Sequence, residues 1–146
     1  MAAPTERAGL VSEVLHRVNY SETDQMGVVY HARYAVWLDV ARTEHLRQRG
    51  LSYRELEASG FRLVVGELVI RYRRSARFDD VVRTRCWVRE RLSRRVTFGY
   101  AVESADGALL ATATTAMLVL DASMRPARLP DAAAALLVPV SDPVRL

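Results

Sequence analysis

The sequence predicts a single α+β domain in which one antiparallel sheet of about five strands curls around a long apolar helix. Two observations support this fold class. A dense apolar segment begins near residue 32 and ends before Gly50, and about four segments of alternating polarity follow it. A chain of 146 residues fits one domain, and no linker, repeat or low-complexity tract divides residues 1–146.

The long helix is predicted over residues 32–49. Its apolar residues are too dense for a surface helix and extend too far for a short strand, and Gly50 is a natural helix stop. Because the first half is apolar nearly all round, we expect other parts of the protein to wrap it. A short second helix is predicted next, since Ser52 and Glu55 have the spacing of a capping box and Gly60 ends the pattern.

The strands are predicted from alternating apolar and polar residues. One strand precedes the long helix over residues 14–20, after a loose lead-in, and places Val14, Val18 and Tyr20 on one face. Each strand has one polar face, as expected for a sheet that is covered on one side. The later strands are expected over residues 63–72, 82–89, 96–102 and 110–120, with a short closing helix over residues 130–137.

The composition is that of a soluble globular protein, with half of the residues hydrophobic and about a quarter charged. The single cysteine, Cys86, cannot form an intramolecular disulfide, and no Cys/His cluster is present to hold zinc. No apolar run reaches the ~18–20 residues of a membrane span, and residues 1–10 lack the apolar stretch of a signal peptide. We therefore expect a cytoplasmic protein with no metal and no membrane span.

The basic charge balance narrows the classes of ligand. The formal net charge is +4, and all 21 basic residues are arginine. This balance suggests nucleic acid, an anionic membrane or a phosphorylated small ligand, and arginine binds phosphate through a planar, two-pronged group. The arginines form two clusters, over residues 71–77 and 83–95, and those that alternate along a strand are interpreted mainly as a solvated sheet face.

A motif over residues 20–34, Tyr-Ser-Glu-Thr-Asp-Gln-Met-Gly-Val-Val-Tyr-His-Ala-Arg-Tyr, leads into the predicted long helix. It resembles the hotdog-fold acyl-CoA thioesterases of the 4-hydroxybenzoyl-CoA thioesterase type, and most of all the branch associated with the bacterial Tol-Pal system. The resemblance continues at residues 41–44, 72–80 and 126–130, and at the Asp-Gly pair of residues 106–107, which is also a hairpin signal. Two positions depart from the family pattern, because Arg33 replaces the usual asparagine and Ser75 replaces a frequent proline.

The resemblance implies a hotdog fold and hydrolysis of a fatty or aromatic acyl-CoA, with no metal or organic cofactor. It also implies a homo-oligomer, a dimer or a tetramer, with the substrate site at the dimer interface. An exposed sheet edge favours the same outcome on physical grounds, because pairing two edges across a two-fold axis removes their unpaired backbone groups.

Asp24 is the catalytic carboxylate that the resemblance implies. It lies in a glycine-containing loop before the helix, and it can attack the thioester carbonyl directly or activate water, so both routes stay open. The first N–H groups of a helix lack internal partners, and the resemblance assigns the oxyanion donor to the backbone of His31. The His31 imidazole either contacts the thioester or only packs. Tyr20 either hydrogen-bonds the carboxylate or closes the end of the first strand.

The substrate needs further contacts, which are also assigned through the resemblance. Leu63, Val64 and Val65 are candidates for the acyl pocket, with core packing as the alternative. Tyr30 is a further candidate for substrate binding, also with packing as the alternative. Arg94 and Arg95 lie at a turn between strands, where relatives place basic groups near the nucleotide of CoA.

Other functions stay open. A thioesterase for a carrier-protein-bound acyl chain needs the same chemistry. A non-catalytic, arginine-rich nucleic-acid-binding module needs exposed aromatic residues among the arginines, and Trp87 is the single suggestive case, although an oligomer contact would also account for it. We therefore expect no nucleic-acid partner. Glu44 lies too far along the helix from His31 to share a site within one chain, but it could approach a partner's site across a dimer.

Overall fold

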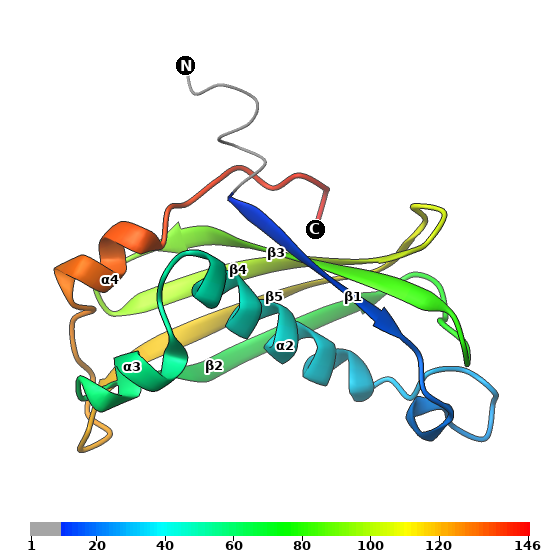
Figure 1. Ribbon diagram of the computed structural model, residues 1–146, viewed down its shortest axis with the longest axis horizontal. Helices are drawn as coiled ribbons and strands as arrows, with labels where there is room; N and C mark the ends of the chain where they lie inside the picture. Colours follow the sequence, from blue (N-terminus) through cyan, green and yellow to red (C-terminus); the bar gives the residue numbers. More distant parts are fainter. Residues whose placement is uncertain (1–9) are drawn as a thin grey trace.

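The computed structural model describes residues 10–146, which form one five-stranded antiparallel sheet with a long helix against one face (Figure 1). The strands lie in the order β1-β3-β4-β5-β2, so β1 and β2 are the two edges. The predicted α+β class and the antiparallel sheet are confirmed. The strands are β1 (Val11–Arg17), β2 (Phe61–Tyr72), β3 (Val81–Arg91), β4 (Arg95–Ser104) and β5 (Leu109–Asp121).

The long helix is α2 (Arg33–Gln48), which differs from the predicted helix by one residue at each end. Gly50 follows the C-cap residue Arg49, and its φ of 85° is a left-handed conformation that glycine adopts without a steric penalty. Trp37, Leu38 and Leu46 are buried on the side of α2 that faces the sheet. The position of the helix was predictable because its apolar density and its stop signal agree.

The opposite side of α2 is not covered by the described chain. Val36 and Val40 are each 48% exposed, and Asp39 beside them is also exposed. The prediction that the first half of this helix is wrapped on all sides is therefore wrong for a single protomer. Two valines half-exposed on one helix face instead form an apolar strip that faces solvent.

The core lies between α2 and the inner face of the sheet. Val82, Cys86 and Val88 from β3 pack there with Phe98 and Tyr100 from β4. The alternation predicted for β3 is confirmed, because the arginines between these residues are on the other face. Burial raises the pKa of the Cys86 thiol, so this lone cysteine is a core residue rather than a nucleophile.

Two short helices flank the sheet. One half of the capping box predicted for α3 (Tyr53–Ala58) is confirmed, because the Ser52 side chain accepts a hydrogen bond from the Glu55 N–H at 3.4 Å. The predicted closing helix is α4 (Asp131–Leu136).

The first strand differs from the prediction. It begins at Val11 and ends at Arg17, three residues earlier than expected, so part of the predicted lead-in is strand; residues 1–9 lie outside the described chain. Val18 is buried, but Tyr20 is 77% exposed and belongs to a 3-10 turn, η1 (Tyr20–Glu22). The alternation in polarity continues past the last residue that pairs with β3, and this continuation displaced the predicted limits.

The C-terminal segment runs alongside β3, where Pro139 forms a bridge with Val88 (Figure 1). The Val140 N–H donates to the Val88 carbonyl at 3.0 Å, and the Asp142 carboxylate accepts hydrogen bonds from Trp87 Nε1 and Arg89 Nε, each at 3.0 Å. Trp87 is fully buried by this arrangement although it is outside the core cluster. Its own chain, rather than a second copy, covers the side chain.

Candidate active site

Asp24 lies in a tight loop that is closed by its own backbone. The Asp24 N–H donates to the Val28 carbonyl at 2.9 Å, and the Gly27 N–H donates to the Asp24 carbonyl at 3.0 Å. Gly27 has a φ of 79°, which a residue with a side chain rarely adopts. The Met26 N–H donates to Asp24 Oδ1 at 2.9 Å, and this bond orients the carboxylate. Its second oxygen makes no hydrogen bond within the described chain and is available to a substrate or a water.

The neck of this loop is fixed by Glu22, which sequence reasoning did not identify. Its carboxylate is buried and accepts hydrogen bonds from the Asn19 N–H at 2.9 Å and from Trp37 Nε1 at 2.7 Å, and it pairs with His16 Nε2 at 2.6 Å. Burial opposes ionisation of this group, but these hydrogen bonds outweigh it and hold the Glu22 pKa below its ordinary value. The Tyr30 N–H, at the other end of the loop, donates to the Glu22 carbonyl at 2.8 Å. Glu22 therefore connects the two ends of the loop, and its bond to Trp37 fixes them to α2.

The peptide groups before α2 are oriented as potential oxyanion donors. The Tyr30 carbonyl accepts from the Arg33 N–H at 2.9 Å, and the His31 carbonyl accepts from the Tyr72 hydroxyl at 2.7 Å. Since C=O and N–H point in opposite directions in a trans peptide, these bonds direct the N–H groups of His31 and Ala32 away from them. Neither N–H makes a hydrogen bond within the described residues. Such free donors at a helix start suit a developing negative charge.

A pocket of about 250 Å³ contains both groups. Asp24 and His31 line it, together with two tyrosines that the prediction did not include. Tyr34 is buried at its base, where its hydroxyl accepts a hydrogen bond from the Ala76 N–H at 3.3 Å, and Tyr72 forms another wall. The structure therefore brings the predicted carboxylate and the predicted helix start into one concave site.

The other predicted residues are more scattered. Tyr20 packs edge-on against Phe78, with ring centroids 5.6 Å apart, and does not line the pocket. Tyr30 is 46% exposed and stacks against the His31 ring at 4.6 Å. On β2, the inward Leu63 is buried in the core, as its alternative reading allowed, whereas Val65 is 46% exposed and Val64 is intermediate.

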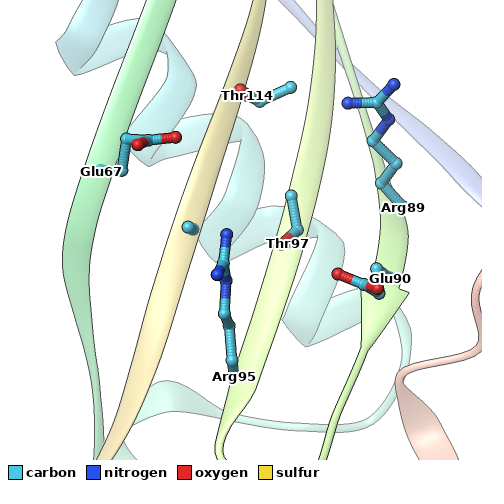
Figure 2. A pocket seen from close by; sticks show the side chains of 7 residues that line it. Glu67, Arg89, Glu90, Arg95, Thr97 and Thr114 are labelled. Carbon is cyan, nitrogen blue, oxygen red and sulfur yellow. The ribbon is translucent and has the colours of Figure 1, made fainter.

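Arg94 and Arg95 lie at the turn between β3 and β4, away from the Asp24 pocket within one protomer. Arg95 lines a different pocket, of about 430 Å³, on the face of the sheet opposite α2 (Figure 2). Figure 2 shows Glu67 and Glu90 on the same surface, with the helix behind the strands. This second pocket holds charges of both signs but lacks a carboxylate beside a helix start.

The sequence places Arg73 and Arg74 in the arginine cluster of residues 71–77, and the structure shows that both line the Asp24 pocket. These two arginines reach the pocket because β2 ends just before them, at Tyr72. No feature of the sequence distinguishes them from the other arginines of the cluster. Tyr72 precedes them and was visible within the motif at residues 72–80.

The described residues contain no group of three or more His, Cys, Asp or Glu side chains that is arranged to hold a metal ion. Within the same range, no helix is long and apolar enough to cross a membrane.

A five-stranded antiparallel sheet packed on one long helix, with a carboxylate-bearing loop at the helix start, defines the hotdog class of thioesterase folds. The chain belongs to the thioesterase-like superfamily, whose family model matches residues 18–137.

Individual relatives agree with this family. The Escherichia coli protein named acyl-CoA thioester hydrolase YbgC is 33% identical over 115 residues, which are 78% of this chain and 86% of that protein. A crystal structure of the hypothetical protein TT1821 from Thermus thermophilus matches with a TM-score of 0.83 and 42% identity, over 86% of this chain and 96% of that one. The DHNA-CoA thioesterase from Staphylococcus aureus matches with a TM-score of 0.79 and 31% identity, over 82% and 80% of the two chains.

Proposed function

We propose that the protein hydrolyses acyl-CoA thioesters, with Asp24 as the catalytic carboxylate and the backbone at the start of α2 as the oxyanion hole. The observation that carries this proposal is the shared pocket of Asp24 and His31, where one oxygen of the Asp24 carboxylate and the backbone N–H of His31 are free of partners in the described chain. The names of relatives such as the E. coli acyl-CoA thioester hydrolase support the choice of substrate class.

The carbonyl oxygen of the thioester accepts a hydrogen bond from the backbone N–H of His31. In one route the free oxygen of Asp24 adds to the carbonyl carbon, the C–S bond breaks, and the thiolate leaves and takes a proton from solvent. Water then hydrolyses the acyl-aspartyl anhydride. In the other route Asp24 takes a proton from a water whose oxygen adds to the carbonyl, and the same proton passes to the departing sulfur. The backbone N–H of His31 stabilises the oxyanion in either case.

Asp24→Asn tests the proposal. The amide keeps the size of the side chain but can neither attack nor accept a proton, so we expect kcat to fall about 10²–10⁴-fold. Asp131→Asn, an exposed acid at the start of α4, is the matched control and should retain full activity. Free thiol released from a panel of acyl-CoA esters that spans chain length and aromatic groups is the measurement. Unchanged turnover of Asp24→Asn on every active ester would remove Asp24 from the mechanism.

We also propose a homo-oligomer, a dimer or a tetramer. The edge strand β2 has Val65, Leu68 and Val69 partly exposed, and Val36 and Val40 on α2 are half-exposed. An exposed, partly apolar edge strand is a surface that proteins usually cover. Light scattering on the purified protein at micromolar concentration measures its mass directly, and a monomer there would contradict this proposal.

A thioester held by an acyl-carrier protein is the nearest alternative substrate, because the same carboxylate and donors would act on it. The arginine-rich nucleic-acid-binding module is less well supported, because Trp87 is covered and several sheet arginines are paired with acids. A gel shift that persists at physiological salt would favour that module. The cytoplasmic location, the absence of a cofactor and the Tol-Pal-associated branch stay predictions.

A further inference from the structure

Arg73 and Arg74 leave β2 in an arrangement that directs both residues to the same pocket. Their backbone N–H groups donate to a single acceptor, the Leu110 carbonyl on β5, at 2.8 and 3.1 Å. Successive residues of a regular strand point to opposite faces of the sheet, but the shared acceptor interrupts that alternation. Both residues therefore line the pocket of Asp24, and both are exposed at its mouth.

The charges of these two arginines are not neutralised by an ion pair within the described residues. The contrast with the sheet arginines is clear, because Arg83 and Arg85 both bind the Glu103 carboxylate, at 2.5 and 3.0 Å. Hydrogen bonds from Ser104 and Ala108 lower the pKa of Asp106, and the charge of Arg74 makes a smaller contribution in the same direction. Because Asp106 is fully exposed, this contact with Arg74 is screened by solvent. The pocket mouth therefore carries two guanidinium groups that are available to an anion.

We infer that Arg73 and Arg74 bind the phosphate of the carrier to which the scissile thioester is attached. This inference rests on the proposed thioesterase function and extends it to the leaving group. The thiol of an acyl-CoA or of an acyl-carrier protein ends a flexible pantetheine arm, which bears a phosphate at its other end. Guanidinium groups bind phosphate through paired, charge-assisted hydrogen bonds.

The alternative position for the carrier is the turn at Arg94 and Arg95. Within one protomer these residues are separated from Asp24, because Arg95 pairs with Leu118 across the sheet and lines the pocket on the outer face. A carrier that reached them would have to cross to another subunit. The two arginine pairs therefore make different predictions for substitutions.

The test uses three double variants that each remove two positive charges. Arg73→Gln/Arg74→Gln removes the proposed site, and Arg94→Gln/Arg95→Gln removes the alternative. Arg125→Gln/Arg128→Gln is the matched control, since both of these arginines are exposed, lie outside the Asp24 pocket and have no salt-bridge partner among the described residues. Each variant is assayed with an acyl-CoA and with the N-acetylcysteamine thioester of the same acid, which has the thioester but no phosphate.

We expect the Arg73/Arg74 variant to raise KM for the acyl-CoA about 10- to 100-fold, with a small change in kcat. The kcat/KM for the N-acetylcysteamine thioester should not change, which a damaged fold would not permit. An acyl-carrier protein and an acyl-dephospho-CoA distinguish the sources of the phosphate. A KM increase with all three carriers indicates the phosphate next to pantetheine, and an increase with CoA alone indicates its 3′-phosphate.

Equal KM values for the Arg73/Arg74 variant and the Arg125/Arg128 control would overturn the inference, as would a KM increase confined to the Arg94/Arg95 variant. Binding of CoA itself, by titration calorimetry, separates this inference from the proposed function. If the wild-type protein binds CoA but hydrolyses no ester, the hydrolytic proposal fails, and weakened binding in the Arg73/Arg74 variant still supports the anion site. If the wild-type protein neither binds CoA nor hydrolyses an ester, both fail.

Discussion

His45 makes the stability of this fold depend on pH through a buried imidazole. Its side chain is 1% exposed on α2, its Nδ1 lies 2.7 Å from the Ser12 hydroxyl, and its ring packs edge-on against Phe98. The Ser12 hydroxyl lies between the His45 ring and the Cys86 carbonyl, which is 3.3 Å from Ser12 Oγ. Burial, and then the nearby charge of Arg49, lower the pKa of His45 from 6.5 to about 4.

The direction of the pH dependence follows from whether the folded or the unfolded state binds the proton of His45. Between pH 6.5 and 4 the unfolded chain binds a proton at this histidine and the folded protein does not, so stability falls as the pH falls through that window. A difference of about 2.5 pKa units corresponds to about 3 kcal/mol when the pH is below both values. From pH 7 to pH 5 the expected loss from this group alone is about 2 kcal/mol.

Urea unfolding at pH 7, 6 and 5 measures this effect, with His45→Asn as the comparison. The asparagine amide can still donate to Ser12, but it does not titrate. The wild-type protein should lose about 2 kcal/mol more of its unfolding free energy than the variant does between pH 7 and pH 5. The contributions of all other groups are common to both proteins and cancel in the comparison. Parallel losses in wild type and variant would refute the assignment of a neutral, buried His45.

Three further substitutions test the packing and the loop. Gly99→Ala should destabilise the fold by about 1–3 kcal/mol in urea unfolding, because the new Cβ would lie 2.5 Å from the Trp87 ring; wild-type stability would show that the indole moves freely. Glu22→Gln should lower kcat more than it changes KM and destabilise the protein by about 1.5–3 kcal/mol, since charge-assisted bonds at the loop neck are lost; a variant with wild-type kcat would show that Asp24 is positioned without it. Ser52→Ala should cost about 1 kcal/mol by calorimetry through the lost cap, and an unchanged melting temperature would show that the 3.4 Å bond is not stabilising.

The sequence predicted the elements whose signals are local and agree with one another. The long helix combines apolar density with a glycine stop, and α3 combines a capping residue with a second glycine, so both were located within a few residues. The limits of β1 were less predictable, because polarity continues to alternate beyond Arg17, where pairing with β3 ends. Pairing depends on the partner strand, which the local pattern does not contain.

The site was predicted in part for a similar reason. Asp24 and His31 belong to one contiguous motif, and a loop followed by a helix start must bring them near each other. Glu22 lies in the same motif, but its role depends on Trp37 and His16, which only the fold brings to its carboxylate. In the same way, sequence could not show that the arginines after β2 reach the pocket while those at the β3–β4 turn do not.

The fold resolves the ambiguity in the basic composition. Arginines along β3 stand beside acids, as Arg85 does with Glu103 and Arg89 with Asp142, so much of the positive charge on the sheet is neutralised where it lies. Nucleic acid would require that charge to remain free across an extended surface. Arg73 and Arg74 have no salt-bridge partner among the described residues and lie at the mouth of a small pocket, where two guanidinium groups can bind one phosphate but cannot follow a polyanion. The placement of these two arginines therefore favours the proposed phosphorylated carrier over nucleic acid as the ligand.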